Sequence, residues 1–301
     1  MIIRVKNKLE NTELELKVSY IDNYGHGVSF RNNIVFLIPG ALEDEIVLAK
    51  PMKTINKKVY CKLTKVKLPS GSRIKEDCKK FIICGGCDFR QVNNTWLKDW
   101  KLEKLIQKTG SLNIQKKILP ITTSKKNSRR RATFSAHYQN GQFNLGFISK
   151  FGEIVIDLQT CKILDKSLLK LYKQLRDNLK RSINKNINFK IQVNLVHNGS
   201  DIVFDLPKGS YKKIFKLDNL ISDLIPLNVL RVSFKEGKRI FSIPLHGQVR
   251  NKLGVLNNKT IFSFPPPGGF LQPTKSGETE IIKYVLSAIK GSKKVADLFC
   301  G

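Results

Sequence analysis

The sequence predicts a multidomain α/β protein with a small β-barrel at its N-terminal end and the opening of a Rossmann-like unit at its C-terminal end. Its 301 residues are enough for two or three domains, each with its own core. Short strand-like runs separated by turn residues fill the first 65 residues or so. In the last 40 residues a helix, a strand and a Cys-Gly turn follow one another.

The N-terminal barrel is predicted over residues 1–65. Runs such as "LELKVSYI", "IVFLIP" and "KKVYCKLTKVKL" are typical of strands, and the segments between them contain Gly, Asn, Asp and Pro. Several short strands in so short a segment imply a closed barrel, because closure removes exposed sheet edges.

A mixed α/β domain is predicted over residues 75–260. Segment 93–110 is typical of a helix that Asn93 or Asn94 caps and Gly110 ends. A second helix is predicted over 166–183, with four leucines on one face: Leu168, Leu171, Leu175 and Leu179. Asn-Gly pairs at 140–141 and 198–199 predict hairpin turns between strands.

Residues 261–301 predict the start of a third domain. A helix is expected with Ser276 as its cap and Gly291 as its stop, followed by an apolar strand in "KKVADLFCG". This order of elements is the opening of a Rossmann-like unit. One strand cannot form a parallel sheet, so we expect this domain to be incomplete at Gly301.

The charge of the chain indicates a polyanionic partner. Lys and Arg total 54 against 24 Asp and Glu, a net charge of +30, and phosphates neutralised by such residues release counterions. The alternative is that biased coding, which would also explain abundant Asn and Ile, has raised the Lys content. The run "SKKNSRRR" at 124–131 likewise has two interpretations: Arg129, Arg130 and Arg131 grip phosphates, or the run is a solvated loop.

Composition also indicates the compartment. The N-terminal residues contain no apolar core of signal-peptide length, and no apolar run reaches the roughly 18 residues that span a bilayer. The six cysteines are too few and too unevenly spaced for a disulfide framework. We therefore expect a soluble protein in the reducing cytoplasm.

Three of the six cysteines form a C-x5-C-x2-C cluster at Cys78, Cys84 and Cys87. Clustered thiolates in a cytoplasmic protein indicate zinc or an iron–sulfur cluster, and this spacing does not decide between them. We expect Cys161 to be the fourth ligand, because it follows a strand and precedes a helix in the same predicted domain. The alternative is that the cysteines are buried and inert.

These residues carry a resemblance to a known family. The segment "CKKFIICGGCDFRQ", with a lone downstream cysteine, resembles the [4Fe–4S] segment of the RNA uracil-5 methyltransferases. Residues 17–50 are similar to the TRAM domain, an OB-like RNA-binding barrel that precedes this segment in many members. "FPPPGGFLQPT" resembles the Phe-x-Gln segment of the family, and "VADLFCG" resembles its S-adenosylmethionine motif.

The resemblance implies roles for individual residues. It assigns the [4Fe–4S] cluster to four ligands: Cys78, Cys84, Cys87 and Cys161. It places Phe270 beside the target base, where a flipped uracil needs a π-face to stack on. It assigns S-adenosyl-L-methionine to Gln272, Asp297, Phe299 and Gly301. Where many members have Val-Asn after the glutamine, this chain has Pro273-Thr274, so the contacts just beyond Gln272 are in doubt.

The function implied is S-adenosylmethionine-dependent methylation of C5 of a uridine in RNA, with 23S rRNA favoured over tRNA. A cysteine thiolate would add to C6 of the uracil, and this cysteine and the general base are expected beyond residue 301. We therefore expect this chain to bind RNA without catalysis, and we expect neither a membrane nor an obligate protein partner. The alternative is a non-catalytic RNA-binding metalloprotein, in which the TRAM barrel accompanies a zinc or iron–sulfur module.

Overall fold

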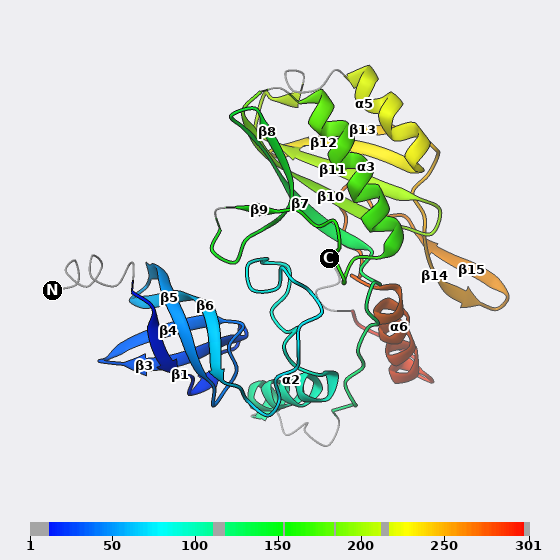
Figure 1. The fold of residues 1–301 in the computed structure, drawn as a ribbon. Coiled ribbons are helices and arrows are strands. Elements are labelled where there is room, and N and C mark those ends of the chain that lie inside the picture. The colour runs from blue at the N-terminus through cyan, green and yellow to red at the C-terminus, as the bar shows by residue number, and fades with distance from the viewer. Residues whose placement is uncertain (1–11, 111–117, 153, 184, 212–216, 298–301) are drawn as a thin grey trace. The chain divides into compact units, whose positions relative to one another are not determined.

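The computed structural model describes residues 12–110, 118–152, 154–183, 185–211 and 217–297 (Figure 1). The chain divides into two compact units, and the division falls within one strand, β8 (Gln142–Ile148). The first unit comprises Met1–Ile121 and Phe147–Ile156, and the second comprises Thr122–Gly146 and Asp157–Gly301. Helices and strands occur in both, so the prediction of a mixed α/β fold is confirmed.

The first unit is built on a six-stranded sheet. Its strands, in the order in which they pair, are β1 (Leu14–Lys17), β5 (Ile46–Ile55), β6 (Lys58–Leu68), β4 (Ile34–Pro39), β3 (His26–Arg31) and β2 (Tyr20–Ile21). All neighbours are antiparallel except β4 and β6, which are parallel. Asn32-Asn33 and Asn56-Lys57 form its tight turns, and all four residues have positive φ, as type I′ hairpins require.

The sheet curls strongly. Its two edge strands, β1 and β2, are consecutive in the chain and separated only by Val18 and Ser19. Each residue of extended chain spans roughly 3.3–3.6 Å, so the two edges must come close together. Ser19 N–H donates to the Val28 carbonyl at 2.7 Å across this junction. The more specific prediction of an OB-like barrel stays a prediction.

A buried ion pair fastens the segment after the sheet. The Glu45 carboxylate is fully buried, and it accepts hydrogen bonds from the Leu42 N–H and the Arg73 guanidinium at 2.9 Å each. Arg73 also donates to the Gly40 carbonyl at 2.7 Å. Because both charges are hydrogen-bonded in the interior, the chain that leads to the cysteines has a fixed starting point.

Helix α2 (Asn94–Thr109) follows the cysteine segment, as predicted. The Asn93 side chain caps it by accepting from the Trp96 N–H at 2.8 Å, and Gly110 is its C-cap. Trp96 and Trp100 stack on each other and pack against Phe89.

The second unit is built on strands of a larger sheet. The sheet runs in the order β13 (Arg239–Pro244), β12 (Val229–Glu236), β11 (Ser200–Leu206), β10 (Ile187–Leu195), β7 (Arg131–Gln139), β8 and β9 (Val155–Ile156). The pairing of β8 with β9 lies in the part of β8 that belongs to the first unit. Neighbours are antiparallel except β11 and β12.

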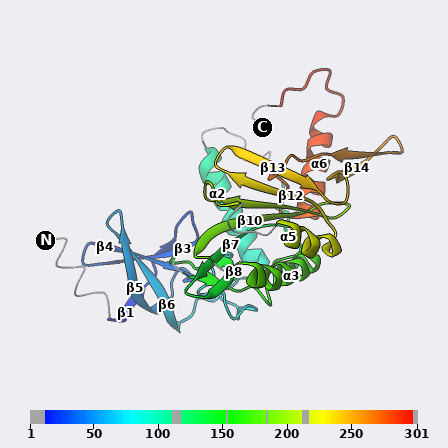
Figure 2. The same ribbon diagram turned by 90° about the horizontal axis from the view of Figure 1, so that it is seen from above.

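Helices α3 (Lys166–Ser182) and α5 (Leu217–Leu224) lie on one face of this sheet, and a short 3₁₀ helix, η3 (Ile225–Leu227), follows (Figures 1 and 2). The four leucines predicted for the apolar face of α3 are buried, and so is Tyr172. The Tyr172 hydroxyl donates to the Leu145 carbonyl at 2.7 Å, which ties the helix to β8. The turn predicted at Asn140-Gly141 joins β7 to β8, and both residues have positive φ.

The C-terminal part contains a two-stranded sheet, β14 (Asn251–Leu256) and β15 (Lys259–Ser263), and helix α6 (Lys275–Ile289). The cap predicted at Ser276 is wrong. Thr274 has an extended backbone and its hydroxyl accepts from the Gly277 N–H at 3.1 Å, so α6 begins one residue after Thr274. The predicted stop is confirmed, because Gly291 follows the helix with φ of +78°.

The strand predicted in "KKVADLFCG" is not seen where the structure describes it. Residues 293–297 form no strand, and the rest of that segment lies outside the described residues. The Rossmann-like start and the predicted domain boundaries stay predictions. In the parts of the chain that the structure describes, none of the helices is both long and apolar enough to cross a bilayer.

Candidate functional site

The cysteine segment is a loop fastened to a neighbouring hairpin of the first unit. The hairpin, residues 147–156, forms β9 and the end of β8. Gly85 N–H donates to the Ile148 carbonyl at 3.0 Å, and Lys150 N–H donates to the Ile83 carbonyl at 2.9 Å. The loop also folds on itself, because the Cys84 N–H donates to the Lys80 carbonyl at 2.8 Å. Backbone contacts therefore place Cys84 against the hairpin.

The two glycines of "CGGC" permit this close approach. A Cβ atom at Gly85 would lie 2.6 Å from the Ile148 carbonyl oxygen. One at Gly86 would lie 2.7 Å from the Phe147 ring. Real Cβ atoms are essentially never so close to other heavy atoms, so any other residue would push the loop away from the hairpin.

Three of the four predicted metal ligands lie on this loop. Cys84 is buried, whereas Cys78 and Cys87 are partly exposed. The structure describes Cys161 in the second unit, where its N–H donates to the Leu158 carbonyl at 3.0 Å. Among the described residues, no three His, Cys, Asp or Glu side chains converge closely enough to hold a metal ion. The ligand set therefore stays a prediction.

A lysine that belongs to none of the predicted motifs lies beside these thiols. The Lys150 ammonium nitrogen is buried and has no hydrogen-bond partner among the described residues. It lies 4.2 Å from the centre of the Phe81 ring. Burial lowers the pKa of Lys150, and the negative charges of Asp88, Cys87 and Cys84 oppose that change. Only the folded chain brings Lys150 to Cys84, because 66 residues separate them in the sequence.

The other predicted site segment, residues 264–274, lies in the second unit. Phe270 is 68% exposed, and the Arg131 guanidinium carbon lies 4.8 Å from the centre of its ring. Gln272 is partly buried, and its carbonyl accepts from the Arg130 guanidinium at 3.1 Å. The segment thus presents an aromatic ring to solvent, while the Arg130 guanidinium holds its backbone by a hydrogen bond.

Side chains of β10 hold the glycines of this segment. Gln192 and Asn194 donate to the carbonyls of Gly268 and Gly269 at 3.1 and 3.2 Å. They alternate along the strand with the buried Ile191, so they project from the opposite face. Gly268 has φ of +70°, a conformation that favours glycine. The chain can therefore lie close to the sheet just before Phe270.

A buried polar network ties the segment to α6. Arg130 Nη2 lies 2.7 Å from Glu278 Oε1, and Arg130 Nη1 donates to the Asn251 amide oxygen at 3.1 Å. Lys275 also pairs with Glu278, at 2.6 Å. Burial raises the pKa of Glu278, but hydrogen bonds from Lys275 and Asn251 and the charge of Arg130 outweigh it, so that pKa lies below its ordinary value.

The three arginines predicted as a phosphate-binding run have separate roles. Arg130 is buried in the Glu278 network, so it is not free to contact a phosphate. Arg129 donates to the Arg131 carbonyl at 3.0 Å, and Arg131 lies over Phe270. Both are partly exposed. The run is therefore neither a phosphate-binding site to which all three arginines contribute nor a simple solvated loop.

Of the remaining predicted cofactor residues, the structure describes Asp297 alone. Asp297 is exposed and belongs to no helix or strand, whereas Phe299 and Gly301 lie outside the described residues.

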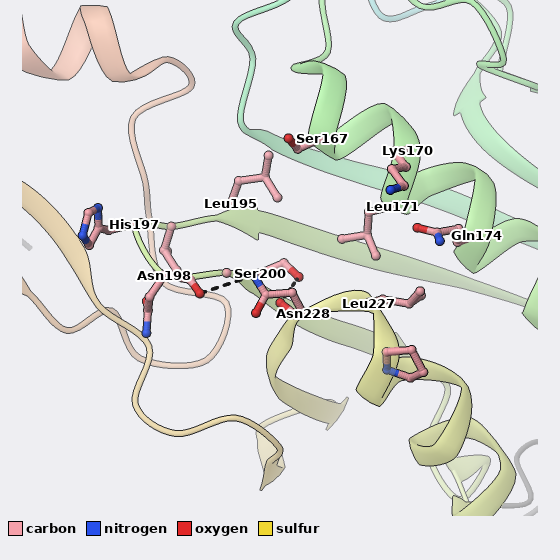
Figure 3. Close-up of a pocket in the computed structure, with 13 residues that line it drawn as sticks. Ser167, Lys170, Leu171, Gln174, Leu195, His197, Asn198, Ser200, Leu227 and Asn228 are labelled. Atoms are coloured by element: carbon pink, nitrogen blue, oxygen red, sulfur yellow. Dashed lines mark hydrogen bonds between the residues drawn. The ribbon is translucent and has the colours of Figure 1, made fainter.

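The structure also has a cavity of about 490 Å³ that was not predicted from the sequence (Figure 3). It lies between α3, the turn after β10 and η3, and its polar lining includes Lys170, Gln174 and His197. None of the predicted site residues lines it.

The fold has a counterpart of known structure. Among solved structures, it is similar to the tRNA (uracil-54, C5)-methyltransferase of Pyrococcus abyssi in complex with S-adenosyl-L-homocysteine. The TM-score is 0.62 at 13% sequence identity, over 93% of this chain and 66% of that one. At this identity the likeness concerns the fold alone.

Sequence relatives define the family. The 23S rRNA (uracil(1939)-C(5))-methyltransferases RlmD of Shewanella sediminis and Shewanella piezotolerans are 24% and 25% identical to this chain, over 98% of it. That of Colwellia psychrerythraea is 30% identical over 57% of it. No protein-family model matches the chain. The predicted relationship to the RNA uracil-5 methyltransferases, a family of enzymes, is confirmed. The chain spans about two thirds of the length of the two Shewanella relatives, 67% in each case.

Proposed function

We propose that this chain acts in the S-adenosylmethionine-dependent methylation of C5 of a uridine in RNA. The observation that carries the proposal is the similarity to RNA (uracil-C5)-methyltransferases over 98% of the chain. The methyltransferase fold of the structural neighbour, which was solved with S-adenosyl-L-homocysteine, supports the choice of methyl donor.

The substrate that we propose is 23S rRNA rather than tRNA. The relatives that match over 98% of the chain are named for 23S rRNA, whereas the structural neighbour, named for tRNA, is only 13% identical. The net charge of +30 suits either RNA. The proposed domains follow the family: a TRAM barrel over 1–65, a cluster-bearing domain over 75–260 and the start of the methyltransferase domain over 261–301.

Phe270 is the proposed contact for the target base. Its exposed ring offers a face on which an unstacked uracil can lie, and Arg131 beneath it adds a positive charge near the RNA backbone. We assign the methyl donor to Gln272, Asp297, Phe299 and Gly301. The backbone carbonyl of Gln272 accepts a hydrogen bond from Arg130, and this contact fixes the residue without using its side-chain amide.

The cysteines are proposed to bind a [4Fe–4S] cluster through Cys78, Cys84, Cys87 and Cys161. The chemistry of the donor set fits, because all four proposed ligands are soft thiols, and the buried ammonium of Lys150 beside the loop has no hydrogen-bond partner among the described residues. When bound, the cluster would supply a structural link that positions the RNA-binding parts, rather than an electron carrier. Cys78, Cys84 and Cys87 would hold it on the loop that the glycine pair keeps against the hairpin.

The chemistry proposed for the whole enzyme requires a thiolate. The thiolate adds to C6 of the uracil, C5 then attacks the methyl group of the donor, a base removes the C5 proton and the thiolate leaves. No residue of this chain is assigned to the thiolate or the base. The chain itself is proposed to bind the RNA and hold the base.

Disruption of the gene, followed by mass spectrometry of nucleosides from purified 23S rRNA, tests the proposal. We expect one 5-methyluridine to be lost from 23S rRNA and to return when the gene is restored. An unchanged 5-methyluridine content in 23S rRNA would contradict the proposed substrate. If tRNA were unchanged as well, the proposed reaction would be wrong, and a non-catalytic RNA-binding metalloprotein would become the better account.

A further inference from the structure

We propose that Lys150 is a positioning residue for the cysteine-bound cluster, whose negative charge its buried ammonium neutralises. The inference rests on the proposed function, because it presupposes that the cysteine loop binds a [4Fe–4S] cluster. Nothing in the resemblance or in the relatives' names points to this lysine.

The environment of the Lys150 ammonium favours an anionic partner. Lys150 Nζ is buried and has no hydrogen-bond partner among the described residues. A buried charge without a hydrogen bond is costly, because the protein interior replaces water poorly. The Phe81 ring, 4.2 Å away, compensates only in part. A bound anion would supply the missing interaction.

The backbone of Lys150 is placed next to the cysteine loop. Its backbone N–H bonds to the Ile83 carbonyl, next to Cys84, and the turn is closed by the Gly152 N–H bonding to the Ser149 carbonyl at 3.0 Å. Gly152 has φ of +87°, which a tight turn at this point requires. The hairpin therefore fixes the backbone of Lys150 beside the cysteine loop.

A cluster on this loop would bring negative charge to the site. A cluster with four thiolate ligands is a net anion, and the reduction potential of such a cluster depends on its net charge and surroundings. The alternative counter-ion is Asp88, whose side chain is exposed and which makes no hydrogen bond to Lys150. An exposed carboxylate is screened by water, so it is the weaker partner.

The test uses the 301-residue chain and four variants, each reconstituted anaerobically with ferrous iron and sulfide. Lys150→Met and Lys150→Gln remove the charge, and Lys150→Arg keeps it. Lys79→Met is the matched control, because it removes a lysine that is exposed on the same loop. Iron and sulfide per chain, visible absorbance and the reduction potential are measured, and circular dichroism reports folding.

Without the charge, the reduced cluster should be disfavoured. We expect Lys150→Met and Lys150→Gln to lower the reduction potential by about 59 mV or more, a tenfold change for one electron. Lys150→Arg and Lys79→Met should match the wild type. A merely structural lysine would change the circular dichroism without this shift, and using two neutral variants guards against one that fails to fold.

The outcomes separate the two claims. If the wild type takes up iron and sulfide and both neutral variants retain its potential, the role of Lys150 is wrong and the cluster stands. If the wild type takes up no iron and sulfide, the cluster proposal fails and the inference fails with it. If Asp88→Asn shifts the potential while the Lys150 variants do not, the carboxylate is the relevant charge, and our assignment is overturned.

Discussion

At the scale of single residues, the basic run at 129–131 shows how burial changes the role of a charged side chain. In the sequence the three arginines are equivalent, and a phosphate grip and a solvated loop explain them equally well. In the structure Arg130 is enclosed by Glu278 and Asn251, residues more than 120 positions away in the chain. No local pattern contains that information, because the partners come from β14 and α6.

Replacing Arg130 should strongly destabilise the second unit. Arg130→Met leaves the buried Glu278 carboxylate with only Lys275 to balance it, and breaking a buried pair costs about 3–5 kcal/mol. Urea denaturation measures the loss. Lys125→Met, which removes an exposed cation from the same run, should change stability by less than about 0.5 kcal/mol. Equal effects of the two substitutions would refute the structural role of Arg130.

Glu278 should make the stability of the chain depend on pH in the acid range. Its pKa is lower in the folded chain than its ordinary value of 4.5, so its contribution is fully present above pH 4.5 and is lost as the pH falls through the lowered pKa. The difference in melting temperature between the wild type and Glu278→Gln should therefore shrink as the pH falls below that value. A difference that grew on acidification would have the wrong sign for this network.

Phe270 should contribute to RNA binding through stacking. Phe270→Ala is expected to weaken binding of a uridine-bearing RNA loop by about 1–3 kcal/mol, the usual effect of losing one base–aromatic stack. Phe264→Ala is the matched control, because Phe264 is also exposed and begins the same segment. Fluorescence anisotropy with a labelled RNA measures both, and equal affinity of the two variants would remove Phe270 from the proposed base contact.

At the scale of elements, the sequence patterns that predicted structure correctly are local ones. The cap at Asn93, the turn at Asn140-Gly141 and the four buried leucines of α3 were predictable, because each depends on residues a few positions apart. Tyr172 was not predicted on the buried face of α3. Its hydroxyl lies within hydrogen-bond distance of the Leu145 carbonyl and the Asp157 carboxylate, which share its one proton, and both acceptors lie outside the helix.

The start of α6 distinguishes the structure from the sequence prediction. Thr274→Ala should destabilise the chain by about 1 kcal/mol, since it removes the hydroxyl that accepts from the Gly277 N–H. Ser276→Ala, at the cap predicted from the sequence, should cost much less. Thermal denaturation of the two variants decides, and the reverse order would restore Ser276 as the cap.

At the scale of the whole molecule, the family was predictable and the geometry of its site was not. Cysteine spacing, the two glycines and "FPPPGGFLQPT" are contiguous motifs, so they can be recognised without a fold. The parallel pairs β4–β6 and β11–β12, and the approach of Lys150 to the cysteine loop, join segments that other elements separate. Such contacts follow from topology, which strand patterns alone leave open.

The proposed function requires that this chain recognise RNA and not merely any polyanion. Its net charge of +30 would bind duplex DNA as well, with an affinity that falls steeply as salt rises. The most direct measurement is equilibrium binding of the 301-residue chain to a uridine-bearing 23S rRNA stem-loop and to DNA of the same sequence, at several salt concentrations. We predict that the RNA binds about tenfold more tightly or better, and that this ratio persists at high salt because stacking is less screened than charge. Equal affinities that fall together as the salt rises would contradict the claim.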